Sequence, residues 1–127
     1  MANTKDKKVM IIEDDKFFIS LIAKKLTDSG FLALFANDGK MAFEVLAQQT
    51  PDIILLDIML PDIDGFEILT RLKKDEHLKD IPVVFLSNLG SKEDINHGKE
   101  LGATDFLIKA TVTMEEVVKE VEKILKV

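Results

Sequence analysis

The chain of 127 residues contains no cysteine and no excess of basic charge. Without cysteine it has no disulfide framework, no thiol nucleophile and no thiolate-bound metal. Its 17 Lys and Arg against 23 Asp and Glu give a formal net charge of −6. A nucleic-acid interface needs a basic face or stripe instead. We therefore expect no direct contact with nucleic acid.

Long apolar runs are also missing. No stretch approaches the roughly 18 apolar residues that a membrane span needs, so we expect no membrane insertion. The N-terminal residues MANTKDKK are basic but no apolar segment follows them, unlike a secretory signal. We expect a cytoplasmic protein with a single domain over residues 1–127, of which residues 1–7 form a flexible polar lead-in.

Two further kinds of site lack their usual sequence pattern. The two histidines, His77 and His97, do not have the spacing of a metal site. No glycine-rich phosphate loop follows the first apolar run, which argues against a nucleotide-binding module. The chemistry of this chain therefore has to come from carboxylates, hydroxyls and amines.

Short apolar runs alternate with longer amphipathic segments. Fully apolar runs of this length are typical of a parallel sheet covered on both faces. With right-handed crossovers, the pattern predicts an α/β fold: a (βα)5 doubly wound, five-stranded parallel sheet with strand order 2-1-3-4-5, flavodoxin-like. The less apolar second run favours an edge strand. The predicted strands lie at residues 9–12, 31–36, 53–56, 83–86 and 106–108.

Amphipathic stripes predict the helices between these strands. The first stripe contains Phe18, Leu21, Ile22 and Leu26, and the last helix opens at Thr113 with capping-box spacing. The helix between Ser91 and Leu101 differs from the others, since Ile95 and Leu101 are its only large apolar residues and Gly98 lies in its interior. We predict that it is weakly docked and able to move; a plain short surface helix is the alternative.

Polar side chains stand where the predicted strands end. Carboxyl ends of parallel strands share one edge of a sheet, and ligands bind there. Crowded carboxylates repel one another unless a cation lies among them, and Mg²⁺ is the cellular cation that prefers oxygen ligands. Asp15 alone is better explained as an acid that opens the first helix. The side chains expected to converge are Glu13, Asp14, Asp57, Ser87 and Lys109.

Asp57 is the best-placed nucleophile of this set. The predicted site contains neither Cys nor His, and an aspartate can form an acyl phosphate. Lys109 and Mg²⁺ would neutralise charge on a transferring phosphoryl group, and the Ser87 hydroxyl would donate a hydrogen bond to it.

Four stretches, VMIIEDD, IILLDIMLPDIDG, IPVVFLSN and GATDFLIK, carry a family resemblance. Their order and spacing resemble those of the receiver domain of two-component response regulators, in particular single-domain receivers like the chemotaxis regulator. The resemblance covers about residues 8–127. It implies a signalling switch activated by phosphorylation, which is not an enzyme in the usual sense but catalyses its own phosphotransfer and dephosphorylation.

The resemblance also implies residue roles. Asp57 matches the phosphoacceptor, and Lys109 matches the lysine that contacts the phosphoryl group. Ser87 and Phe106 match the pair of switch residues that move together on phosphorylation. The implied Mg²⁺ ligands are Glu13, Asp14, Asp57 and the backbone carbonyl of Met59.

The implied partners are proteins. The phosphoryl donor would be a histidine kinase or a histidine phosphotransfer protein. A downstream protein would bind the face formed by the helix at 91–101, the strand at 106–108 and the last helix. The expected oligomeric state is a monomer or a phosphorylation-dependent dimer.

Two positions depart from the family pattern. Asn88 stands where the family usually has a small residue, so we expect it to restrict access to the phosphoryl group. Ala110 follows Lys109 where the family commonly has a proline in a cis peptide. A cis bond before a non-proline residue costs about 2.5–4 kcal/mol, which favours a trans bond here, or else a strained cis one.

Two alternative functions stay open at this point. A pseudo-receiver would use the same fold as a phosphorylation-independent interaction module, but it is expected to have lost the acid cluster or the lysine. A phosphatase with an aspartate nucleophile usually carries a second aspartate two residues later, whereas position 59 is Met.

Overall fold

The computed structural model describes residues 6–127 of the chain. Residues 1–5 of the predicted lead-in therefore lie outside the described residues. Of the remainder, the carbonyl of Lys7 accepts a hydrogen bond of 2.9 Å from the backbone N–H of Leu32. The chain is thus already tied to the sheet one residue before the first strand.

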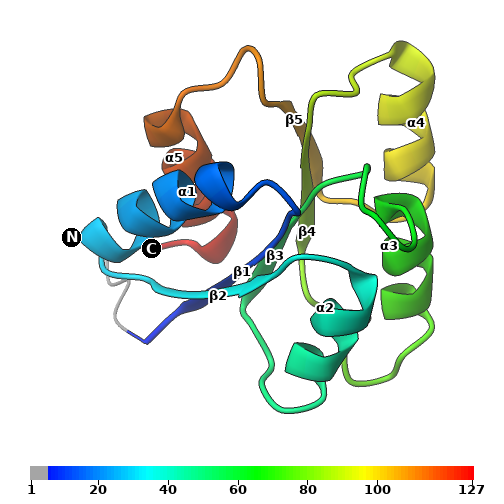
Figure 1. Ribbon diagram of the computed structural model, residues 1–127, viewed down its shortest axis with the longest axis horizontal. Helices are drawn as coiled ribbons and strands as arrows, with labels where there is room; N and C mark the ends of the chain where they lie inside the picture. The colour runs from blue at the N-terminus through cyan, green and yellow to red at the C-terminus, as the bar shows by residue number, and fades with distance from the viewer. Residues whose placement is uncertain (1–5) are drawn as a thin grey trace.

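Five strands alternate with five helices along the described chain (Figure 1). The strands are β1 (Lys8–Ile12), β2 (Leu32–Ala36), β3 (Ile53–Leu56), β4 (Val83–Ser87) and β5 (Asp105–Ile108). The helices are α1 (Lys16–Asp28), α2 (Gly39–Leu46), α3 (Gly65–Lys73), α4 (Lys92–Glu100) and α5 (Met114–Leu125). Each strand end lies within one residue of its predicted position, and a helix follows each strand as predicted.

The strands form one parallel sheet in the order β2-β1-β3-β4-β5. This confirms the predicted topology. The three inner strands are almost wholly buried, because helices cover both of their faces, whereas β2 at the edge keeps exposed side chains. The less apolar second run in the sequence therefore did indicate an edge strand.

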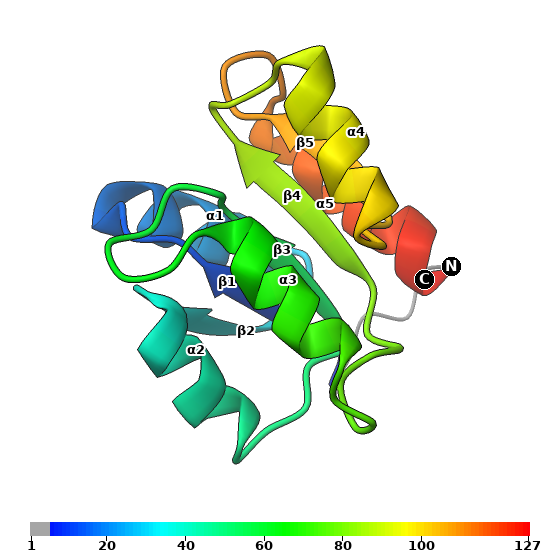
Figure 2. The same ribbon diagram turned by 90° about the vertical axis from the view of Figure 1, so that its right-hand side faces the viewer.

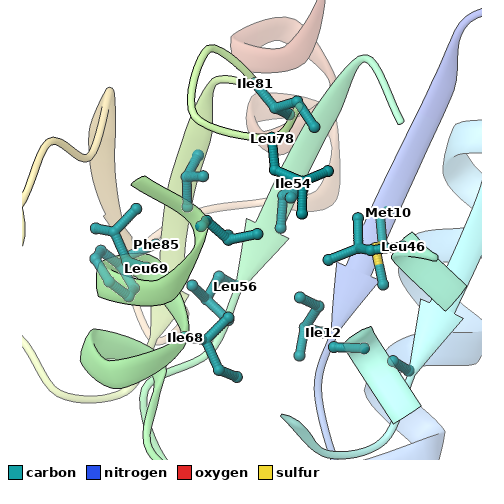
Figure 3. Close-up of a cluster of buried hydrophobic side chains, with 14 of the residues drawn as sticks. Met10, Ile12, Leu46, Ile54, Leu56, Ile68, Leu69, Leu78, Ile81 and Phe85 are labelled. Atoms are coloured by element: carbon teal, nitrogen blue, oxygen red, sulfur yellow. The ribbon is translucent and has the colours of Figure 1, made fainter. Parts of the chain in front are cut away.

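The helices form two layers, one on each face of the sheet (Figures 1 and 2). Side chains alternate along each strand, so Val9 and Ile11 of β1 join the buried cluster under α1 and α5. Met10 and Ile12 point to the opposite cluster, under α2, α3 and α4. Figure 3 shows this second cluster between the strands and the helices. Both faces of the sheet are thus filled with apolar side chains, which fixes the ends of its strands in space.

One member of the first predicted stripe is placed differently. Leu21 is 42% exposed, and Ile19 is buried along with Ile22 and Leu26. The prediction that Leu21 joins the buried stripe was wrong, because α1 is rotated so that Ile19 faces the sheet. Three- and four-residue spacing fits several overlapping stripes, and only the contact with the sheet selects one.

Two predictions near α5 are confirmed, the capping box and the trans peptide bond before Ala110. The capping box at the start of α5 is present between Thr113 and Glu116. In α4 the buried residue is Gly98, while Ile95 is half-buried. No peptide bond among residues 6–127 is cis, so the bond between Lys109 and Ala110 is trans, as predicted. None of the described helices has the length and apolar character needed to cross a bilayer.

Candidate functional site

Three carboxylates meet at the carboxyl edge of the sheet. Glu13 and Asp14 follow β1, and Asp57 follows β3, the strand beside it. One carboxylate oxygen from each of the three lies within 4.8 Å of the other two. Glu13 and Asp57 are buried and Asp14 is exposed, so the cluster is open to solvent on the Asp14 side. These acids are far apart in the sequence, and the structure brings them together as predicted.

The backbone holds Asp57 in a fixed position. Its N–H donates to the carbonyl of Ile12 at 3.0 Å, which continues the β1–β3 ladder past the end of the strand. Its Oδ1 accepts a hydrogen bond of 2.7 Å from the N–H of Ile58. Its Oδ2 lies 3.2 Å from the Nζ of Lys109. The residue is 7% exposed, so the carboxylate is buried but reachable from the open side.

The loop after Asp57 folds back tightly on itself. The N–H of Gly65 donates to the carbonyl of Ile58 at 2.8 Å, and a Cβ at position 65 would lie 2.3 Å from the backbone oxygen of Asp57. Only glycine fits there, which explains the Asp-Gly at the end of the signature stretch. The side chain of Met59 is 64% exposed. The side chain of Met59 therefore extends into solvent.

Asp62 in the same loop forms contacts that the sequence did not indicate. Its carboxylate accepts hydrogen bonds from the N–H groups of Gly39 at 2.8 Å and Lys40 at 2.9 Å, at the start of α2. The bond from Gly39 is the main cause that lowers the pKa of Asp62. The loop that carries Met59 is thereby attached to α2, through a contact that spans 23 residues.

Lys109 directly follows β5, at the same carboxyl edge of the sheet as the acids. Its ammonium pairs with Glu13 and with Asp57, and its side chain is 11% exposed. The ring of Phe18, in the first turn of α1, lies 4.6 Å from the Nζ of Lys109. The sequence analysis assigned Phe18 only to a packing stripe. Its place three residues after the acidic stretch was the one available signal that it lies near the site.

Burial and charge shift the pKa values of the central pair. Burial raises the pKa of Glu13 from an ordinary 4.5 to about 7, and the charge of Asp57 adds to the rise while Lys109 opposes it. For Lys109, burial is the largest cause and would lower the pKa. The hydrogen bond to Glu13 and the charge of Asp57 outweigh burial, so the pKa of Lys109 is raised. Lys109 is therefore cationic at neutral pH.

The two candidate switch residues are both buried. Ser87 is 1% exposed, and its Oγ accepts a hydrogen bond of 3.2 Å from the N–H of Leu89. Phe106 is 9% exposed, and its ring centroid lies 5.5 Å from that of Phe85. The structure thus places Ser87 at the end of β4 and the Phe106 ring in the core beside α4. Asn88, the departure from the family pattern, is exposed.

The donor set suits a hard divalent cation. Three carboxylates and one ammonium leave two formal negative charges when all are ionised. All the side-chain donors are oxygens, and Mg²⁺ binds through few carboxylates together with waters and phosphoryl oxygens. The acidic cluster is thus a site that a divalent cation fits.

Comparison with known proteins gives the family. The sequence model of the response regulator receiver domain matches residues 9–122. The chain belongs to this family. Receiver domains of two-component systems interact with histidine kinases and downstream effectors, and this is the class of signalling protein to which the chain is assigned.

Individual relatives agree with that assignment. The DNA-binding dual master transcriptional regulator RpaA of a Synechocystis strain is 37% identical over 119 residues, which are 94% of this chain and 49% of RpaA. The phosphorylated cyanobacterial phytochrome response regulator RcpA is 35% identical, with a TM-score of 0.81 over 93% of this chain and 92% of RcpA. The receiver domain of Francisella response regulator 1452 is 31% identical, with a TM-score of 0.87 over 95% and 98%. The chain spans about half the length of RpaA.

Proposed function

We propose that Asp57 accepts a phosphoryl group from a histidine kinase or a histidine phosphotransfer protein, and that the resulting acyl phosphate alters a protein-binding face. The observation that supports this most is the meeting of Asp57 with two further carboxylates and the Lys109 ammonium at one edge of the sheet. Asp57 is the nucleophile, because its Oδ2 lies 3.2 Å from the ammonium of Lys109.

The transfer exchanges one bond for another. An Asp57 carboxylate oxygen forms a P–O bond, the N–P bond of the donor phosphohistidine breaks, and the imidazole nitrogen keeps the electron pair. In dephosphorylation, a water oxygen forms a new P–O bond, the P–O bond to Asp57 breaks with its electron pair on the carboxylate, and inorganic phosphate is released with the protons of the water. Lys109 holds positive charge at the oxygens that gain negative charge, so the catalysis is mainly positioning and electrostatics.

Glu13, Asp14, Asp57 and the Met59 carbonyl would hold Mg²⁺. When bound, the ion supplies positive charge to the phosphoryl oxygens. The chain's own contribution is to hold three carboxylates close together by fixed backbone geometry, with Lys109 pairing two of them. Ser87 donates its hydroxyl hydrogen to the phosphoryl group, and its Oγ can still accept from the N–H of Leu89, because one hydroxyl donates and accepts at the same time.

The output face consists of α4, β5 and α5. Phe106 lies in β5 and contacts Phe85, the residue of β4 that precedes Ser87 by two positions. Movement of Ser87 therefore reaches Phe106 and α4 through packed side chains, which shifts a pre-existing equilibrium of that face. A downstream protein binds this face, and the chain is a monomer or a phosphorylation-dependent dimer.

A small phosphodonor tests the proposal without the cognate kinase. The purified chain is incubated with acetyl phosphate and Mg²⁺, and its intact mass is measured. We expect the mass to rise by one phosphoryl group, with the modification on Asp57. Asp57→Asn abolishes the gain, whereas Asp80→Asn, which changes an exposed aspartate away from the site, leaves it intact.

The same experiment separates the alternatives. No gain in mass in the folded wild-type protein with Mg²⁺ present would contradict phosphorylation and favour a constitutive interaction module. A gain that survives in Asp57→Asn would move the acceptor to another side chain. Omission of Mg²⁺ is expected to slow the reaction strongly, because no cation then offsets the negative charge of the acid cluster and of the phosphoryl group.

A further inference from the structure

The ammonium of Lys109 touches a third group besides its two carboxylates. The ring centroid of Phe18 lies 4.6 Å from the Nζ of Lys109, within the distance at which the face of an aromatic ring attracts a cation. Glu13 and Asp57 belong to the ends of β1 and β3, while Phe18 belongs to the first turn of α1. The ammonium is therefore held from separate elements of the fold.

We propose that Phe18 is a positioning residue for phosphoryl transfer, whose ring keeps the Lys109 ammonium over the acid pocket. This inference rests on the proposed function, because it concerns the same reaction at Asp57. Phe18 does not touch the reacting atoms; it acts through Lys109.

A lysine needs such support more than most cations do. Its charge sits at the end of a flexible four-carbon stem with freely rotating donors. The Lys109 side chain is only 11% exposed, so the attraction between ring and ammonium acts where little water weakens it. Without the ring, only Glu13 and Asp57 constrain the ammonium.

The ring has a property that the carboxylates lack. When Asp57 becomes an acyl phosphate, Lys109 has to transfer hydrogen bonds from carboxylate oxygens to phosphoryl oxygens. The attraction to the face of Phe18 does not depend on which oxygen accepts those bonds. It therefore persists through the transfer, and keeps the ammonium in place while its partners change.

The chain offers a matched control one residue away. Phe17 is the same residue type in the same helical turn, but it is 72% exposed. Replacement by leucine removes an aromatic ring at either position with the same change in helix propensity. Only the replacement at position 18 removes the contact with Lys109.

The test measures the rate of Asp57 phosphorylation by acetyl phosphate with Mg²⁺ in Phe18→Leu and Phe17→Leu. We expect Phe18→Leu to react roughly three- to tenfold more slowly than wild type. Phe17→Leu should react at the wild-type rate, and Phe18→Tyr should retain most of it because the ring is kept. In a Lys109→Met background, Phe18→Leu should cause no further loss.

Three results would overturn the inference. The first is equal rates for Phe18→Leu and Phe17→Leu, and the second is an undiminished effect of Phe18→Leu in the Lys109→Met background. The third comes from NMR of the unphosphorylated chain, where the Lys109 ε-methylene protons should be shifted upfield by the ring in wild type but not in Phe18→Leu. Lys109 ε-methylene protons without an upfield shift in the wild type would exclude the contact, whether or not the variant folds well. Wild-type protein that takes up no phosphoryl group would instead overturn the proposed function.

Discussion

Helices α4 and α5 flank the same strand but are held in different ways. Figure 2 shows them on opposite sides of β4 and β5. Helix α5 buries three valines, Val117, Val118 and Val121, and begins with a capping box. Helix α4 buries one residue, Gly98, which has no side chain to pack. The output face thus combines one firmly anchored helix with one loosely anchored helix.

The loosely anchored helix is the one that contacts the candidate switch. A Cβ at Gly98 would lie 3.1 Å from the ring of Phe85 and 3.4 Å from that of Phe106. The backbone of α4 therefore rests directly on the rings of Phe85 and Phe106. A ring that rotates there displaces α4 at little cost, because few apolar contacts resist the movement. This difference supports the prediction that α4 is the part that moves.

The largest expected effect comes from shortening one apolar side chain in each helix. Val121 of α5 is fully buried, so Val121→Ala should lower the free energy of unfolding by about 2 kcal/mol. Ile95 is half-buried, and Ile95→Ala should lower it by less than about 1 kcal/mol although it removes more atoms. Urea unfolding monitored by circular dichroism gives both values. An equal or larger loss for Ile95→Ala would contradict the difference in anchoring.

The caps of the two helices give a second, smaller contrast. The side chain of Thr113 accepts from the N–H of Glu116 in α5, and that of Ser91 accepts from the N–H of Asp94 in α4. Thr113→Ala should cost about 1 kcal/mol of global stability. Ser91→Ala should instead raise local amide exchange in α4 with little global change, since we expect α4, whose buried residue is Gly98, to open separately from the rest of the domain. Native-state hydrogen exchange measures both, and a purely global effect of Ser91→Ala would show that α4 opens only with the whole domain.

The smallest change in stability is expected from Gly98→Ala. Alanine favours a helix over glycine by about 1 kcal/mol, but the added methyl group pushes against the Phe85 ring. The two effects oppose each other, so net stability should change by less than about 1 kcal/mol. The amide resonances of α4 and β5 should nevertheless shift. The matched control is Lys99→Ala, an exposed position, and similar shifts in both variants would mean that α4 does not rest on the rings.

Sequence patterns predicted the sheet and the acid cluster well for one physical reason. Strands buried on both faces must be continuously apolar, so a polar residue at the end of such a run is conspicuous. Asp57 follows four buried residues, and Glu13 follows another such run. Once the strand order is known, those ends have to be neighbours. The fold and the meeting of the acids follow from these runs alone.

Contacts between helices or loops and the site were less predictable. The amphipathic stripe does not distinguish Phe18, which covers an ammonium, from Leu21, which faces solvent, because both residues fit it. The link from Asp62 to the start of α2 joins residues 23 positions apart and depends on how the loop turns. Such contacts depend on helix rotation and loop path, which are set by tertiary packing rather than by sequence periodicity.

The most direct test of the account is amide NMR during titration with beryllofluoride and Mg²⁺, in wild type and in Asp57→Asn. Beryllofluoride imitates the acyl phosphate. We expect saturable shifts at Ser87, Phe106 and throughout α4, smaller shifts in α5, and none of these in Asp57→Asn. Shifts confined to the acid pocket, or a response as large in α5 as in α4, would contradict a switch in which α4 is the moving part.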